Sequence, residues 1–216
     1  MTKLTLVIGN KNYSSWSLRP WLAMKQFGLE FDEIRIPLYT PKSKAQLRQY
    51  SPSGKVPVLI HDTLTVWDSL AICEYLAEEF PRLPWWGKDR IVKAIARSLS
   101  AEMHSGFGNL RQQMPMNCRA RLPGQGLTAE VQQDIDRITT IWREYRQRFE
   151  TEGNLLFGEF TIADAMFAPV VLRFITYAVP LDPISQHYAE TIVALPAMQE
   201  WLEAAVSETE TISQYK

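Results

Sequence analysis

The sequence predicts two domains in series, an α/β domain followed by an all-α domain. In the first 80 residues, short apolar runs typical of strands alternate with stretches of helical spacing. From about residue 90 to the end, only helical spacing is found. The stretch between the two patterns is rich in proline and tryptophan and has no periodicity, so we place the domains at 1–81 and 88–216, with a linker at 82–87.

The first domain is expected to contain one small mixed sheet. Its strands are the buried run 4–9, the alternating run 31–38, and a hairpin of 55–60 and 64–67. Its helices are 21–28, which stops at a glycine, the polar segment 42–50 and the amphipathic segment 69–80. A βαβ unit followed by a hairpin and a helix forms a single sheet with helices on both faces.

The second domain is expected to consist of long helices separated by prolines and one glycine-rich loop. The helical segments are 88–114, 128–150, 161–178 and 188–208. Thr161 and Asp164 have the spacing of a capping box, and we interpret them as a folding signal and not as a catalytic acid. Trp85 and Trp86 are expected to pack the linker onto this domain; the alternative is a subunit interface.

Composition and charge exclude several classes of function. The chain has 216 residues, a net charge of −1 and 46% hydrophobic residues, with both signs of charge interspersed. This pattern argues against nucleic acid or a membrane surface as the main partner. No apolar run approaches the roughly 18 residues of a membrane span, and the N-terminus does not resemble a signal peptide, so we expect a cytoplasmic protein.

The cysteines and histidines predict neither a disulfide nor a metal site. Cys73 and Cys118 lie far apart, and two buried free thiols are favoured over a disulfide. The three histidines form no metal-ligand pattern with the cysteines or carboxylates. We therefore expect no metal.

A serine-rich loop, "NYSSWSLRPW" at 12–21, joins the first strand to the first helix. Serines at a helix start are usually N-caps. The same place can stabilise an anion, including a thiolate, because unpaired N–H groups and the positive end of the helix dipole meet there. Pro20 lacks an N–H group, so the helix must begin late or have an irregular first turn.

Two further motifs are compatible with either structure or binding. In "GKVPVL" at 54–59, Pro57 is either an ordinary edge proline or part of a cis Val56–Pro57 bond, which would leave the backbone of Val56 free to pair with a peptide-like ligand. In "WDSL" at 67–70, Asp68 and Ser69 are either a helix cap or a site for the α-amino-acid end of a ligand.

The order of these motifs resembles the glutathione S-transferase superfamily over the whole chain. "SSWSLRPWLAM" is similar to its serine-type, zeta- and tau-like classes, and 51–81, "SPSGKVPVLIHDTLTVWDSLAICEYLAEEFP", is the most specific stretch. The resemblance implies a thioredoxin-like N-terminal domain, an α-helical C-terminal domain, a homodimer, and glutathione as co-substrate.

The resemblance also implies roles for individual residues. Ser14 matches the serine that donates to the glutathione sulfur, with Ser15 as the runner-up. Val56, before Pro57, matches the residue whose backbone pairs with the cysteinyl part. The remaining matches are Asp68 and Ser69 for the γ-glutamyl end, and Lys55 and Lys42 for the glycine carboxylate.

Two positions depart from the family pattern. Asp68 is one methylene shorter than the more usual Glu or Gln, so its direct reach to the ligand ammonium is in question. Trp16 stands where zeta members carry a cysteine, which weakens an assignment as maleylacetoacetate isomerase. The expected function is conjugation of the glutathione thiolate to a small, largely apolar electrophile. The alternatives are a glutathione-dependent isomerase or dehalogenase, or a non-catalytic binding relative.

The electrophile is expected to bind between the domains. On the predicted helix 88–114, four residues recur at i, i+3, i+4 and i+7 and would form one face: His104, Phe107, Gly108 and Arg111. Arg111 would hold an anionic substrate, and Tyr13 and Trp16 would close the mouth. The alternative is that His104 and Arg111 are solvated or interface side chains.

Overall fold

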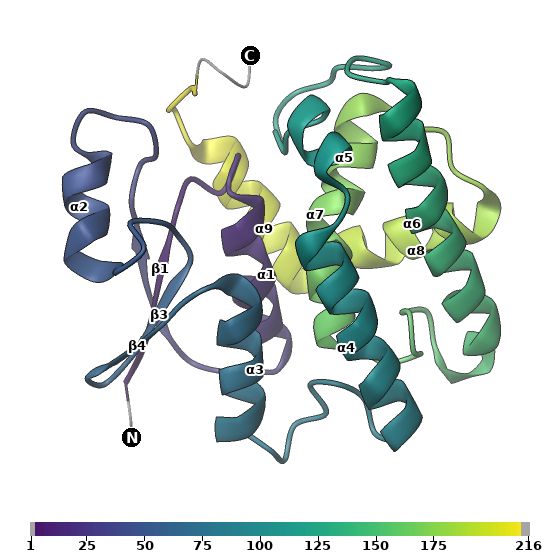
Figure 1. The fold of residues 1–216 in the computed structure, drawn as a ribbon, viewed down its shortest axis with the longest axis horizontal. Coiled ribbons are helices and arrows are strands. Elements are labelled where there is room, and N and C mark those ends of the chain that lie inside the picture. The colour runs from purple at the N-terminus through teal and green to yellow at the C-terminus, as the bar shows by residue number, and fades with distance from the viewer. Residues whose placement is uncertain (1–2, 213–216) are drawn as a thin grey trace.

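The computed structural model describes residues 3–212, and within them a four-stranded sheet forms the core of the N-terminal domain (Figure 1). Its strands, in the spatial order β2-β1-β3-β4, are Leu4–Ile8 (β1), Asp32–Arg35 (β2), Val58–His61 (β3) and Leu64–Val66 (β4). β2 runs parallel to β1, and β3 runs antiparallel to both of its neighbours, β1 and β4. The predicted α/β class of this domain is confirmed.

Helices cover both faces of the sheet. Successive side chains of β1 point to opposite faces, and each face packs against different helices. The helices are Ser15–Gln26 (α1), Ser43–Tyr50 (α2) and Ser69–Glu79 (α3). Leu6 of β1 belongs to the large core that contains the buried residues of α1 and α3. Val7 belongs instead to a smaller core with Leu47 of α2. Successive residues of a strand point to opposite faces, so α2 lies on the face opposite α1 and α3.

The C-terminal domain is all-helical, as predicted. Its helices are Arg90–Ser105 (α4), Gly108–Gln113 (α5), Ala129–Arg148 (α6), Ile162–Tyr177 (α7), Pro183–Ala194 (α8) and Pro196–Ser207 (α9), with a 3-10 turn at Glu150–Glu152. α7 is buried along almost its whole length and packs against α1 and α4. The apolar core is therefore continuous between the two domains.

Three predicted helix boundaries are wrong. α1 begins at Ser15 and not at residue 21, and Pro20 lies inside it. The predicted helix 88–114 is broken into α4 and α5, because Phe107 adopts a left-handed conformation with φ of 57°. The predicted helix 188–208 is two helices, since Pro196 starts a new one.

The linker tryptophans were predicted to pack onto the helical domain, and they contact both domains. Trp85 and Trp86 are both buried. The Trp85 indole N–H donates to the Phe80 carbonyl at 3.1 Å, and its ring contacts Phe27 with centroids 4.3 Å apart. The Trp85 carbonyl accepts the N–H of Ile162 at 2.8 Å, which ties the linker to the first residue of α7.

The start of α7 depends on one buried carboxylate. Asp164 accepts the Thr161 N–H at 2.8 Å and the Thr161 hydroxyl at 3.0 Å. It also accepts the Leu156 N–H at 3.1 Å and the Tyr188 hydroxyl at 3.2 Å. Burial raises the pKa of Asp164 to about 6, so the group is ionised at pH 7. This geometry confirms the capping box.

Replacing this carboxylate is expected to destabilise the fold. In Asp164→Asn, the side-chain NH₂ group would replace one carboxylate oxygen and point at groups that also donate. The buried N–H and O–H groups that now bind that oxygen would be left unpaired. The free energy of unfolding, measured by urea denaturation, should fall by about 3 kcal/mol. The control is Asp136→Asn on the exposed face of α6, where a change within about 0.5 kcal/mol is expected. Equal effects of the two substitutions would contradict the role of Asp164.

Candidate functional site

A cavity of about 820 Å³ lies where the serine-rich loop meets α5 and α7. It is lined by Tyr13, Ser14, Ser15, Trp16, Leu38, Tyr39, Thr40, Pro41, Ser43, Lys44, Leu47, Gly54, Lys55, Val56, Gly108, Arg111, Gln112, Pro115, Met116 and Arg173. Both domains therefore contribute to its wall. Four of the lining residues are cationic, and no described Asp or Glu lines it, so the cavity favours anionic groups.

Ser14 is the N-cap residue of α1, but its side chain makes no capping hydrogen bond. Its hydroxyl oxygen lies 2.7 Å from the hydroxyl oxygen of Ser17, which in turn accepts the N–H of Gly9 at 3.1 Å. When Ser17 donates to Ser14, the Ser14 proton is free to point into the cavity. The usual structural role of a serine at this position is thus absent, and a donor is held at the positive end of the helix.

Ser15 presents a second hydroxyl at the same helix start. Its oxygen accepts a hydrogen bond from the Arg173 guanidinium at 3.1 Å. The guanidinium is buried and is fixed by two further bonds, to the carbonyls of Met114 at 2.9 Å and Pro169 at 3.2 Å. A hydroxyl that accepts from a cation becomes a stronger donor, so Ser15 is also suited to bind an anion.

Arg19 adds a buried positive charge behind the serines. It is fully buried, and none of its side-chain nitrogens has a hydrogen-bond partner among residues 3–212. Its guanidinium lies 4.2 Å from the ring centroid of Trp16, and that of Arg111 lies 5.6 Å from the same ring. Burial, together with the charges of Arg173 and Arg111, lowers the pKa of Arg19 to about 9, so it remains charged at pH 7.

The loop before β3 forms the opposite wall. The Val56–Pro57 bond is cis, the second of the two conformations left open by the sequence. The pairing of β3 with β1 begins at Val58, so Val56 lies beyond the ladder. Lys55 and Val56 both line the cavity, while Pro57 is buried and does not.

Asp68 caps α3 and also contacts the helical domain. One carboxylate oxygen accepts the N–H groups of Leu70 and Ala71 at 3.1 and 3.2 Å. The other lies 2.8 Å from Nε2 of His104 on α4. Ser69 is buried, and its hydroxyl has no partner within the described part of the chain. Neither Asp68 nor Ser69 lines the cavity.

The predicted second-substrate face is only partly brought together. Because α4 ends before Gly106, His104 and Arg111 do not share one helical face, and that prediction is wrong. Tyr13, Trp16, Gly108 and Arg111 line the cavity. His104 instead pairs with Asp68, Phe107 is buried in the core, and Lys42 lies outside the cavity at the N-cap of α2.

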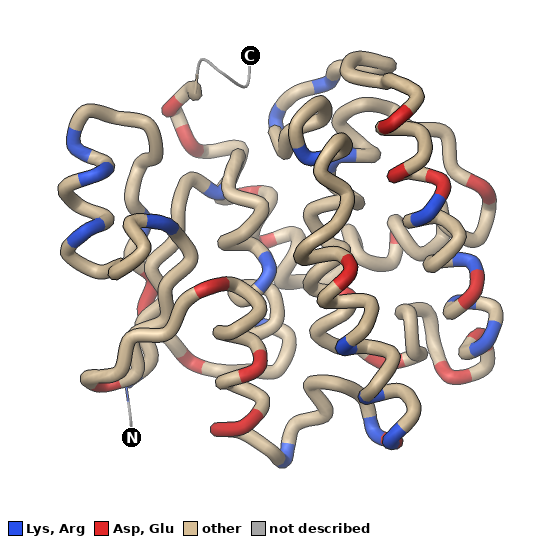
Figure 2. Tube along the Cα trace, viewed as in Figure 1, with Lys and Arg blue, Asp and Glu red and all other residues tan. Residues whose placement is uncertain are grey.

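Several residues at the site were not predicted, and three of them are polar residues next to the predicted groups. Ser17 belongs to the serine-rich loop but was not distinguished from its neighbours. Arg173 is a lone charge within the apolar run of α7, a signal that could have drawn attention to it. Lys44 lines the cavity on α2; Figure 2 shows Lys and Arg along α2, whereas α3 carries only acidic charges.

The cysteines of the chain are unsuited to chemistry. Cys73 and Cys118 are both free and buried, as predicted. Burial raises the pKa of each thiol to about 12. Within residues 3–212, no group of three or more His, Cys, Asp or Glu side chains is placed to hold a metal ion. No helix in the same range is long and apolar enough to cross a membrane.

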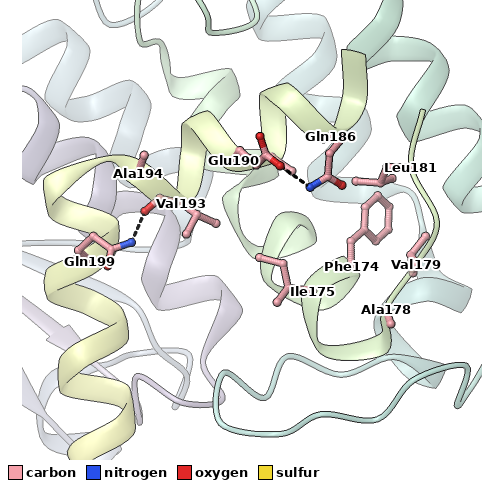
Figure 3. Close-up of a pocket in the computed structure, with 11 residues that line it drawn as sticks. Phe174, Ile175, Ala178, Val179, Leu181, Gln186, Glu190, Val193, Ala194 and Gln199 are labelled. Atoms are coloured by element: carbon pink, nitrogen blue, oxygen red, sulfur yellow. Dashed lines mark hydrogen bonds between the residues drawn. The ribbon is translucent and has the colours of Figure 1, made fainter. Parts of the chain in front are cut away.

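A second cavity, of about 470 Å³, lies between α7, α8 and α9 (Figure 3). Its wall is mostly apolar, and its polar side chains are already engaged. The Gln186 amide donates to Glu190 at 2.8 Å, and the Gln199 amide donates to the Val193 carbonyl at 2.6 Å. None of the predicted site residues lines it, so the first cavity is the candidate site.

Both domains match known family models. Residues 13–79 match the family model described as "Glutathione S-transferase, N-terminal domain", and residues 128–204 match "Glutathione S-transferase, C-terminal domain". The first match contains both serines, Lys55, Val56 and the start of α3, and the second contains Arg173.

Individual relatives and solved structures are similar over most of the chain. A probable maleylacetoacetate isomerase from Caenorhabditis elegans is 28% identical over 189 residues, 85% of each chain. The maleylacetoacetate isomerase of Rattus norvegicus is 28% identical over 192 residues, 86% of this chain and 85% of the relative. The crystal structure of a glutathione transferase homolog from Burkholderia GL BGR1, with bound glutathione, superposes with a TM-score of 0.73 at 25% identity, covering 95% of this chain and 100% of the homolog.

The buried charge of Arg19 is expected to lower the stability of the protein. Arg19→Met removes no hydrogen bond and relieves the burial of an uncompensated charge, so the free energy of unfolding should stay unchanged or rise by about 1 kcal/mol. The control is Arg146→Met, another buried arginine, which donates to the carbonyls of Leu155 and Gly153. That substitution should cost about 3 kcal/mol. Equal losses in urea denaturation would mean that Arg19 has a structural partner.

Proposed function

The chain belongs to the glutathione S-transferase superfamily, and we propose that it joins the glutathione thiolate to a small electrophile in the cavity between the domains. The superfamily makes it a glutathione-dependent enzyme. The observation that carries the proposal is the Ser14 hydroxyl, which is released from capping and lies in the cavity wall at the start of α1. Ser14 donates to the sulfur, with Ser15 as the alternative donor.

Glutathione would extend from the loop before β3 to the start of α3. The backbone of Val56 pairs with the cysteinyl part, and Lys55 and Lys42 attract the glycine carboxylate. Asp68 and Ser69 hold the γ-glutamyl end. Both oxygens of Asp68 already have partners and the Ser69 hydroxyl is buried, so binding of the γ-glutamyl end requires these side chains to rearrange.

The charges around the serines are sufficient to ionise the thiol. A free cysteine thiol has a pKa of about 8.5. Lowering the pKa by about 2 units requires about 2.7 kcal/mol of differential stabilisation. A hydroxyl donor, the helix N-terminus and the buried charges of Arg19 and Arg173 can together supply that amount. The thiol loses its proton to solvent, and the thiolate then forms the C–S bond. At a saturated carbon the leaving group departs with its electron pair; at a polarised double bond the displaced π pair takes a proton from solvent.

A second candidate is a glutathione-dependent isomerase that acts on a carboxylate-bearing substrate. It is supported by the two arginines, Arg111 and Arg173, in a cavity wall without described carboxylates, and by the similarity to proteins named maleylacetoacetate isomerase. A dehalogenase would use the same groups. Trp16 stands where zeta members carry a cysteine, and this favours conjugation over isomerisation. A non-catalytic relative would not need the arrangement of serines at the start of α1.

The family resemblance extends the proposal to assembly and location. We propose a cytoplasmic homodimer. Sedimentation equilibrium of the purified chain tests the dimer, and a mass corresponding to one chain at micromolar concentration would contradict it.

Replacing the sulfur-binding hydroxyl is expected to reduce activity more than binding. Ser14→Ala should lower kcat/KM about 100-fold and raise the apparent pKa of bound glutathione by about 1 to 2 pH units, measured by thiolate absorbance. The affinity for glutathione should change less than about threefold, because the other contacts remain. Ser15→Ala is the matched variant: a larger effect there would assign the donor role to Ser15, and no effect of either would overturn the proposal.

The nature of the second substrate is tested with a matched pair of electrophiles. Arg111→Met should lower kcat/KM for chloroacetate about tenfold or more, but leave chloroacetamide within about twofold, because only the first carries a carboxylate. Equal losses would show that Arg111 does not recognise the substrate charge. Consumption of glutathione, followed with an unsaturated carboxylic acid, separates the two candidate functions, since an isomerase leaves its concentration unchanged.

A further inference from the structure

The turn before Ser14 has an unusual set of hydrogen-bond partners. The Asn10 carbonyl accepts the N–H groups of Tyr13 at 3.1 Å and Ser14 at 2.8 Å, which closes the turn. Lys11 and Asn12 form its tip. Both are buried, so their backbone groups require partners.

A single carboxylate binds both amide groups of the tip. One oxygen of Glu208 accepts the Lys11 N–H at 2.7 Å, and the other accepts the Asn12 N–H at 3.1 Å. Glu208 follows α9, nearly two hundred residues away in sequence, and only 9% of it is exposed. Charge-assisted hydrogen bonds to consecutive N–H groups are strong and fix orientation as well as position.

The carbonyls and the Asn12 side chain of the tip also bind the helical domain. The Lys11 carbonyl accepts the Trp201 indole N–H at 3.0 Å, and the Asn12 carbonyl accepts the Cys118 N–H at 3.2 Å. The Asn12 side chain accepts the Arg119 N–H at 3.0 Å and donates to Asn117 at 3.0 Å. The helical domain therefore holds the backbone and the Asn12 side chain of the tip, while the Lys11 ammonium pairs with Glu33 of β2 at 2.9 Å.

The chain after α9, residues 208–212, continues along the same turn; we call it the C-terminal segment. Figure 1 shows it leaving α9 on the side of the molecule where β1 leads into α1. The Arg119 guanidinium donates to the carbonyls of Glu208 and Glu210, the latter at 2.7 Å, and to the Tyr13 hydroxyl at 3.3 Å. The Ile212 N–H donates to the same hydroxyl at 3.4 Å.

We propose that Glu208 is a positioning residue for catalysis, which sets the Ser14 hydroxyl against the sulfur by holding the two residues at the tip of the turn. This inference rests on the proposed function. Ser14 is two residues from the carboxylate-bound amide of Asn12, so loss of the contact displaces the hydroxyl. A shift of about 1 Å at a reacting centre can cost about 100-fold in rate.

The test is Glu208→Gln in the full-length chain, compared with Glu210→Gln. The side-chain amide introduced by Glu208→Gln would accept only one of the two N–H groups and would direct its own N–H₂ at the other. Glu210 lies in the same segment, where its side chain pairs with Arg35 at 2.8 Å and does not contact the turn. Both substitutions remove one negative charge that pairs with Arg35, at 3.4 Å for Glu208 and 2.8 Å for Glu210, and only Glu208→Gln removes bonds to the turn.

For Glu208→Gln we expect kcat to fall at least tenfold, KM for glutathione to change less than threefold, and the apparent pKa of the bound thiol to rise by about one pH unit. Glu210→Gln should change kcat and KM by less than twofold and leave the apparent pKa of the bound thiol unchanged. A purely structural role would lower the melting temperature but leave the thiol pKa in place, and that result would overturn the proposal.

Two further variants keep the test decisive. If Glu208→Gln does not fold, Arg119→Gln releases the main chain of the C-terminal segment and should show the same rise of the thiol pKa; no rise would overturn the proposal.

In the double variant Ser14→Ala/Glu208→Gln, the effects of the two single substitutions on the thiol pKa should not add, because Glu208 acts through Ser14. If the pKa of bound glutathione stays at the wild-type value in both Ser14→Ala and Ser15→Ala, the proposed function itself is refuted. An effect of Ser14→Ala without one of Glu208→Gln would refute only the positioning role.

Discussion

The buried tip of the turn at Lys11 and Asn12 is the constraint on which the site depends. Its backbone groups have left water, so each needs a hydrogen-bond partner within the protein. Neither the sheet nor α1 supplies those partners; Glu208, Trp201 and the segment 117–119 do. The serine-bearing loop is therefore correctly placed only when the helical domain is docked.

This dependence explains why the cavity lies between the domains. The N-terminal domain contributes two hydroxyls at the start of α1, and the helical domain contributes the guanidinium that polarises one of them. A site on the N-terminal domain alone would lack both Arg173 and the contacts that hold the turn. The close packing of α1 against α7 makes this arrangement rigid, because the two helices share one continuous apolar core.

The charges at the site conflict with the stability of the fold. A buried guanidinium without a hydrogen-bond partner, such as Arg19, raises the free energy of the folded state. On the proposed function, the same charge contributes to stabilising the thiolate near Ser14. Natural sequences break local rules mainly where function requires it, and Arg19 is the clearest such case among the described residues.

Features of the fold that depend on neighbouring residues can be predicted from the sequence, whereas contacts between residues far apart in the chain cannot. The order of strands and helices, the capping box of Asp164 and the cap of α3 at Asp68 follow from patterns within a few residues. The break at Phe107 was missed although Gly106 and Gly108 flank it, because the helical spacing of 88–114 was given more weight than these two glycines. The partners of the serine loop, Arg173 and Glu208, were missed because no local pattern links residues so far apart.

No described cysteine lines the cavity. At position 16, the Trp16 ring centroid lies 4.2 Å from the Arg19 guanidinium and 5.6 Å from that of Arg111. The chain has only two cysteines, and burial raises the pKa of both thiols to about 12. Neither can supply a thiolate at neutral pH. On the proposed function, the reactive sulfur therefore comes from glutathione and not from the chain.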